Sequence, residues 1–88
     1  MQFEFGPNKS ASNLAKHGLD FIDAQALWSD PERLEVKLRF EAEPRYAVIG
    51  TIREKHWTAI IAYREERVRI ISVRRSHKDE ERLYDENL

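Results

Sequence analysis

The chain has 88 residues, of which 41% are hydrophobic and 35% are charged, so it has room for one small domain around a single core. It contains no cysteine, which excludes disulfides and thiol chemistry. The first residues lack the apolar region of a signal peptide, and the apolar run 59–62 is too short to span a membrane. We therefore expect one domain over residues 1–88, in the cytoplasm and with no membrane partner.

The net charge of −1 hides an uneven distribution along the chain. Residues 44–78 hold nine basic and three acidic side chains, whereas the net charge is −3 over residues 1–43 and −4 over residues 79–88. A basic segment between two acidic ones indicates a surface for a polyanion. The alternative is a set of ordinary, solvated salt-bridge partners.

The N-terminal third is expected to form a strand and two helices. Residues 2–5 alternate polar and aromatic side chains, as a short strand does. Gly6 and Pro7 suit the start of a helix that ends at Gly18, and Asp20 can cap a second helix that ends near residue 30. The side chains that share one side of this second helix are Phe21, Ala24, Leu27 and Trp28.

From Leu34 the hydrophobic period changes to two, which is typical of strands. A last helix is predicted to begin at Ser76, with Asp79 three residues on, and to end near Asp85. The order β-α-α-β-β-β-β-α predicts an α+β domain with a mostly antiparallel sheet, N-terminal helices on one face and a C-terminal helix. The four predicted strands after the helices are residues 34–40, 45–53, 56–64 and 67–74.

Loop positions decide which side chains share a face of this sheet. With Glu54-Lys55 and Glu65-Glu66 at the loop tips, Arg53 lies opposite His56 and Arg64 lies opposite Arg67. The apolar core face then holds Tyr46, Val48, Gly50, Ile52, Trp57, Ala59, Ile61, Tyr63, Val68 and Ile70. The other, basic face holds Arg45, Ala47, Ile49, Thr51, Arg53, His56, Thr58, Ile60, Ala62, Arg64, Arg67, Arg69 and Ile71.

The arginines of the basic face need an anion. Arg45, Arg64 and Arg67 would be cross-strand neighbours, where like charges cost up to about 1 kcal/mol. Guanidinium forks suit phosphate oxygens, so a phosphodiester backbone across this face explains the pattern. The alternative is local neutralisation by Glu43, Glu65 and Glu66.

The histidines give no metal signature. His17, His56 and His77 are far apart and have no second ligand at metal spacing, so we expect neither a metal site nor a cofactor. Histidine exchanges a proton near neutral pH, which makes His17 and His56 candidates for acid or base. The plainer explanation for His17 is its place at a helix C-terminus, where a cation is favourable.

Distinctive short motifs lie near both ends of the chain. They are Lys16–Gly18, Phe21–Ala24, Arg45, Arg69–Arg74 and Glu81–Tyr84. Together they resemble the BrnT family of bacterial toxins, over nearly the whole chain. The resemblance implies a RelE-like ribonuclease fold and a type II toxin–antitoxin role, in which a toxin cuts RNA until a partner antitoxin inhibits it.

The resemblance also implies a partner. The expected antitoxin is BrnA-like, with a ribbon-helix-helix DNA-binding domain, and forms a complex of two copies each that binds operator DNA through the antitoxin. At Gly6 the chain departs from the family, which usually has an aspartate there. Such an aspartate would cap the first helix, and glycine should cost only a few tenths of a kcal/mol.

RelE-like nucleases are understood to use the ribose 2′-hydroxyl as nucleophile, without a metal, and to leave a 2′,3′-cyclic phosphate. This chemistry needs a base, an acid and cations around the phosphate. We expect Arg64 and Arg69 to contact the phosphate, His17 or His56 to act as base or acid, and Tyr84 to be a second such group. The residues expected to guide the RNA backbone are Lys16, Arg45, Arg53, Arg67, Arg74 and Arg75.

Two other functions compete with this interpretation. In the first, the basic face belongs to a non-catalytic binding module that receives an acidic partner. Direct DNA recognition is the weaker one, because the predicted helix 76–86 carries five carboxylates that a phosphate backbone would repel.

Overall fold

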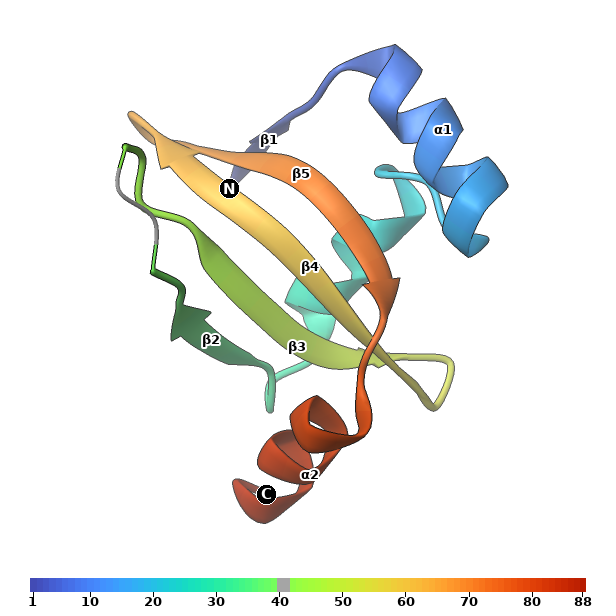
Figure 1. Ribbon diagram of the computed structural model, residues 1–88, viewed down its shortest axis with the longest axis vertical. Coiled ribbons are helices and arrows are strands. Elements are labelled where there is room, and N and C mark those ends of the chain that lie inside the picture. The colour runs from blue at the N-terminus through green and yellow to red at the C-terminus, as the bar shows by residue number, and fades with distance from the viewer. Residues whose placement is uncertain (40–41) are drawn as a thin grey trace.

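The computed structural model describes residues 1–39 and 42–88, so Phe40, the last residue of the predicted strand 34–40, lies outside the described residues. It shows a five-stranded sheet with helices around it, which confirms the predicted α+β class (Figure 1). Within this part of the chain, no helix is long and apolar enough to cross a membrane. The elements are β1 (Gln2–Glu4), α1 (Pro7–His17), η1 (Asp23–Ser29), β2 (Leu34–Lys37), β3 (Tyr46–Ile52), β4 (Lys55–Arg64), β5 (Arg67–Arg75) and α2 (Lys78–Glu86).

The sheet is mixed. Its strand order is β1-β5-β4-β3-β2, and β1 runs parallel to β5 while the other neighbours are antiparallel. After β1 the chain passes through α1 and η1 and enters the sheet at the opposite edge, as β2 (Figure 1). The parallel pairing places the first strand beside the last one, a contact that the hydrophobic pattern did not predict.

The predicted ends of α1 are confirmed. Gly6 is the N-cap with extended backbone, Pro7 follows it, and Gly18 ends the helix with a φ of 83°. Only glycine adopts that left-handed conformation at little cost, which explains why α1 stops there. No atom lies within 4 Å of a Cβ built on Gly6, so a longer side chain would fit at this N-cap.

The other two helices differ from the prediction in detail. Asp20 accepts hydrogen bonds from the backbone N–H groups of Ile22 and Asp23, as a cap does, but the segment that follows is a 3₁₀ helix. The N-cap of α2 is His77 and not Ser76, because the Glu80 carboxylate accepts the backbone N–H of His77 at 2.7 Å.

The predicted turn between β3 and β4 is wrong by one position. Arg53 and Glu54 form it, with φ values of 51° and 70°, so His56 lies opposite Thr51 and Arg53 is part of the turn. The pairing therefore moves by two residues, which leaves each side chain on its predicted face because side chains alternate with period two. Tyr46 pairs with Ile61, so Arg45, the residue before it, lies level with Ala62. The predicted register would have placed Arg45 opposite Arg64.

The predicted pairing of Arg64 with Arg67 is confirmed, but β5 is irregular further along. The register changes between Ile60 and Ile61 of β4. Ile60 pairs with Ser72 and Ile61 pairs with Ile70, so Ile71 is an extra residue in β5. Such a bulge reverses the alternation beyond it. Val73 therefore turns into the core, Arg74 lies on the basic face, and Arg75 lies on the core side.

The core lies where the sequence placed it, between the core face and η1. Phe21, Ala24 and Leu27 pack against the sheet, and Gly50 leaves the space for Leu27, whose Cδ2 lies 3.0 Å from a Cβ built on the glycine. Tyr63 was assigned to the core and is 45% exposed instead, since it lies at the end of β4 beyond the helices. The buried core-face residues are Val48, Trp57, Ala59, Ile61, Val68 and Ile70.

We expect Leu27→Ala to lower the free energy of unfolding by about 2–5 kcal/mol, because the removed atoms leave a cavity in a fully buried site. Leu14→Ala removes the same atoms from a side chain that is 49% exposed and should cost about 0.5 kcal/mol or less. Urea unfolding followed by circular dichroism measures both values. Equal losses in the two variants would contradict the position of Leu27 in the core.

Candidate nucleic-acid interface

Three arginines surround one carboxylate at the end of the sheet where the β4–β5 hairpin turns. Glu4, the last residue of β1, is the register partner of Arg69 on β5. Its carboxylate lies 3.0 Å from Arg69 Nη1, 3.8 Å from Arg67 Nη1 and 3.9 Å from Arg64 Nη1. We call these residues, Glu4, Arg64, Arg67 and Arg69, the Glu4 cluster.

The Glu4 cluster keeps an excess of positive charge. One carboxylate faces three guanidinium groups, and only the contact to Arg69 is short enough for a hydrogen bond. The side chains of Arg64 and Arg67 are 58% and 56% exposed. Since each guanidinium has five N–H donors, most of those donors stay open to an anion from solution.

The sequence left open the alternative that nearby carboxylates neutralise the arginines of the basic face. A carboxylate does contact three of them, but it is not one of the three glutamates that were considered. In the described part of the chain these arginines pair with Glu4, and not with Glu43, Glu65 or Glu66. Sequence reasoning missed Glu4 because it lies 65 residues from Arg69 and joins it through the parallel pairing of β1 with β5.

Arg74, expected to contact RNA, is held by α2 instead. Its Nη1 and Nη2 donate to the two carboxylate oxygens of Glu80 at 2.7 and 2.9 Å, and Thr58 Oγ1 donates to the same carboxylate at 3.1 Å. Burial raises the pKa of the Glu80 carboxyl, but the hydrogen bonds from Arg74, His77 and Thr58 outweigh it and lower this pKa to about 2. Both terminal nitrogens of the Arg74 guanidinium therefore make contacts within the protein.

This ion pair should make stability depend on pH. The pKa of the Glu80 carboxyl is about 2 in the folded protein and ordinarily 4.5, so the stabilisation is complete above pH 4.5 and is lost as pH falls towards 2. We expect Glu80→Gln to lower the free energy of unfolding by about 2 kcal/mol at pH 7 and by clearly less at pH 2. Urea unfolding of both proteins over this range tests it. If the difference in the free energy of unfolding between the two proteins does not become smaller below pH 4.5, the role of the Glu80 charge is contradicted.

Tyr84 fastens α2 to the rest of the molecule. Its side chain is buried, and its hydroxyl donates to Asp30 Oδ2 at 2.7 Å; the same oxygen accepts the backbone N–H and the hydroxyl of Thr51. Burial and the hydrogen bond to Asp30 raise the pKa of the Tyr84 hydroxyl. The Tyr84 hydroxyl therefore makes a structural contact at the end of the sheet that holds His56, away from the Glu4 cluster.

His56 lies beside α2 as well. Its Nε2 is 3.2 Å from Asp85 Oδ1, its ring meets that of Tyr84 edge to face, and its backbone carbonyl accepts a hydrogen bond from Arg75 Nε. The Arg75 guanidinium lies over the ring of Trp57, at 5.6 Å from the centroid. Trp57 itself is buried in the core, as expected.

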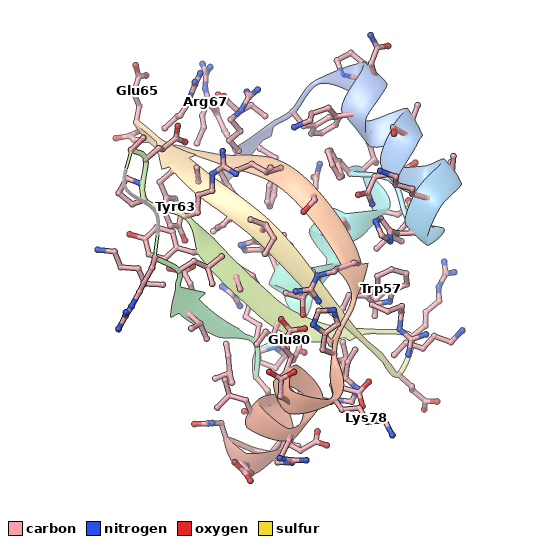
Figure 2. The ribbon with its side chains drawn as sticks, viewed as in Figure 1. Trp57, Tyr63, Glu65, Arg67, Lys78 and Glu80 are labelled. Atoms are coloured by element: carbon pink, nitrogen blue, oxygen red, sulfur yellow. The ribbon has the colours of Figure 1, made fainter. Side chains whose placement is uncertain are left out.

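The two ends of β4 are too far apart to serve one phosphate. His56 and Arg64 are eight residues apart on this strand, which corresponds to roughly 26 Å at about 3.3 Å per residue. In Figure 2, Arg67 lies near the β4–β5 hairpin and Glu80 lies beside the other end of the sheet. The structure therefore does not bring His56 or Tyr84 together with Arg64 and Arg69.

The remaining candidates lie elsewhere. Lys16 and His17 line a pocket between α1 and β5. Arg53 lines another pocket, which also contains the carboxylates of Asp23 and Asp30 and is therefore a poor place for phosphate. Arg45 directly precedes β3, and its carbonyl accepts the backbone N–H of Leu38 at 2.8 Å. Over residues 1–39 and 42–88, no three His, Asp or Glu side chains gather as a metal-binding group.

A comparison with protein families supplies the biological context of these sites. Residues 5–80 match the family described as the ribonuclease toxin BrnT of type II toxin–antitoxin systems. The chain belongs to the BrnT family. A search of curated proteins found no match. Membership of a type II family implies a protein antitoxin as partner, and it confirms the resemblance noted in the sequence.

The match covers much of the candidate interface. It includes Arg64, Arg67 and Arg69, begins one residue after Glu4 and ends before Tyr84. Among the candidate sites in the described residues, the Glu4 cluster is the one in which three arginines lie within 4 Å of one carboxylate.

Proposed function

We propose that the protein is a metal-independent endoribonuclease that cuts RNA at the Glu4 cluster. The observation that carries this proposal is the carboxylate of Glu4 among three guanidinium groups, two of them more than half exposed. A carboxylate can take a proton, and the arginines can stabilise charge on a phosphate, so both requirements of RNA cleavage meet at one place.

The proposed reaction is an internal transfer at one phosphodiester. The Glu4 carboxylate takes the proton of the ribose 2′-hydroxyl, the 2′-oxygen forms a bond to phosphorus, and the bond from phosphorus to the 5′-oxygen breaks. Arg64 and Arg69 neutralise the charge that builds up on the phosphate oxygens. Because the cluster is open to solvent, water supplies the proton to the departing 5′-oxygen, and the other fragment ends in a 2′,3′-cyclic phosphate.

This assignment replaces the expected base. The candidates were His17, His56 and Tyr84. His56 and Tyr84 lie at the other end of β4, and His17 lines the pocket between α1 and β5. Glu4 lies 3.0 Å from Arg69, so an RNA phosphate that binds this arginine would lie beside the carboxylate. Arg67 at 3.8 Å from the same carboxylate is placed to guide the RNA backbone.

The same surface is the proposed binding site of the antitoxin. We propose a RelE-like fold and a BrnA-like ribbon-helix-helix antitoxin that covers the Glu4 cluster in a complex of two copies each and carries the operator-binding function. Support comes from the family and from the net positive charge of the cluster, which suits an acidic segment of a partner. A partner and an RNA substrate of this kind favour a cytoplasmic site of action.

The test uses purified, antitoxin-free protein in excess EDTA, with an RNA and with the same sequence methylated at every 2′-oxygen. We expect the protein to cut the RNA and leave the methylated strand intact, because the nucleophile is blocked. Cleavage that EDTA abolishes would overturn metal independence. Cleavage of the methylated strand would overturn the role of the 2′-hydroxyl. RNA that stays intact even with translating ribosomes would favour the binding module.

A further inference from the structure

A second group of cations lies beside the edge of the sheet, at the pocket between α1 and β5. This pocket has a volume of about 260 Å³ and, in the described part of the chain, no carboxylate in its lining. We call it the α1 pocket. Its lining residues are Lys9, Ser12, Asn13, Lys16, His17, Ile71 and Ser72.

The fold holds α1 firmly in place beside β5. The Asn13 side chain is buried; its amide nitrogen donates to the carbonyl of Val73 at 2.8 Å, and its oxygen accepts the backbone N–H of Val73 at 3.1 Å. It thus occupies the free edge of β5 as a neighbouring strand would. Lys9 and Lys16 flank Asn13 at helical spacings of four and three residues, so both lie on the side of α1 that faces the pocket.

Within the described residues, the two lysines of this pocket differ from Arg69 and Arg74 in having no carboxylate partner. Arg69 pairs with Glu4 and Arg74 pairs with Glu80, whereas Lys9, Lys16 and His17 form no ion pair with any residue in the ranges 1–39 and 42–88. Each lysine carries three N–H donors, and Ser12 and Ser72 add hydroxyl groups. These donors, with no carboxylate among the residues that line the pocket, fit a phosphate group.

The α1 pocket lies close to the Glu4 cluster. Both use β5, where Arg69 belongs to the cluster and Ile71 and Ser72 line the pocket. Three residues from Arg69 to Ser72 correspond to roughly 10 Å along a strand, a distance that a few nucleotides of single-stranded RNA can span. The bulge at Ile71 lies between the two places.

We propose that the α1 pocket binds a backbone phosphate of the RNA, next to the phosphate that is cut at the Glu4 cluster. This inference rests on the proposed function, since it takes RNA as the ligand. It makes Lys9, which the sequence did not single out, a binding residue together with Lys16. It also gives Lys16 and His17 a place on the RNA path without a role in the proton transfers.

The first test measures binding of an uncleavable, 2′-O-methylated single strand at several salt concentrations. Lys9→Ala/Lys16→Ala should raise Kd roughly tenfold at 0.1 M salt and lower the slope of log Kd against log salt by about 0.7–1.4. The matched control, Lys78→Ala/Arg82→Ala, removes the same charge from exposed positions of α2 and should leave the slope unchanged. Equal changes of Kd and of the salt slope in the two double variants would overturn the proposed phosphate site, because they would reflect net charge alone. Inorganic phosphate at millimolar concentration should not compete, and full competition would identify a site for free phosphate instead.

The second test follows cleavage against RNA length. In the wild type, kcat/KM should rise about tenfold once the substrate is long enough to reach the α1 pocket. In Lys9→Ala/Lys16→Ala this rise should be absent. Substrates too short to reach the pocket should have the same kcat/KM with both proteins. Equal length dependence in both proteins would overturn the pocket and leave the proposed nuclease standing. If the wild type cuts no RNA, the proposed function fails, and the pocket is then judged by the binding test alone.

Discussion

Glu4→Gln is expected to slow RNA cleavage by about 10²–10⁴-fold, the usual contribution of a general base. Glutamine has the size of glutamate and can still accept the hydrogen bond from Arg69, but it cannot take the 2′-proton. RNA binding should be kept or become tighter, because the cluster loses its negative charge. Single-turnover cleavage with saturating protein separates the rate of the chemical step from binding.

Glu66→Gln is the matched control, since it removes one carboxylate from the β4–β5 hairpin at the same end of the sheet. It should cut RNA at the wild-type rate. If Glu4→Gln also cuts at that rate while its urea midpoint falls, Glu4 is a structural counterion of the arginines. The proposed base would then be wrong.

The double variant Arg64→Ala/Arg69→Ala should lose about 10²–10³-fold in the rate of cleavage, because the phosphate would lose two charge-stabilising groups. The variant Arg64→Lys/Arg69→Lys keeps both charges but loses the planar fork, so it should be intermediate. Affinity for the antitoxin should fall in the alanine variant too, if the partner covers the same surface. Cleavage rates and antitoxin binding are measured on the same preparations.

A control for charge is Lys55→Ala/Arg82→Ala, which removes two cations from the other end of β4 and from α2. Its cleavage rate should stay within about twofold of the wild type. Equal losses in the two double variants would contradict a local role of the Glu4 cluster and indicate a general effect of net charge on RNA capture.

Local sequence signals were sufficient for much of the fold. Gly6 and Pro7 marked the start of α1 because both residue types are common at helix N-termini, and Gly18 marked its end because its positive φ favours glycine. Period-two patterns found the strands and separated the two faces. The turn at Arg53 and Glu54 was misplaced, since two residues without glycine or asparagine take positive φ there and give no composition signal.

The sites depended on contacts that no local pattern reports. Glu4 joins Arg69 through a parallel pairing between the two ends of the chain, and Tyr84 reaches Asp30 across 54 residues. Arg74 had been interpreted as an RNA-binding residue, but it pairs with Glu80. The sequence pattern predicted the pairing of Arg64 with Arg67, while the positions of Arg45 and Glu4 required the structure.

The most direct test of the account is the chemical nature of the new 3′ ends. RNA is incubated in excess EDTA with wild type and, in parallel, with Arg64→Ala/Arg69→Ala purified in the same way, and the fragments are analysed by mass spectrometry. We expect 2′,3′-cyclic phosphate ends that form with the wild type and are reduced at least 100-fold with the variant. Ends with a 3′-hydroxyl, or equal amounts of cyclic ends from both proteins, would contradict cleavage by the 2′-hydroxyl at the Glu4 cluster.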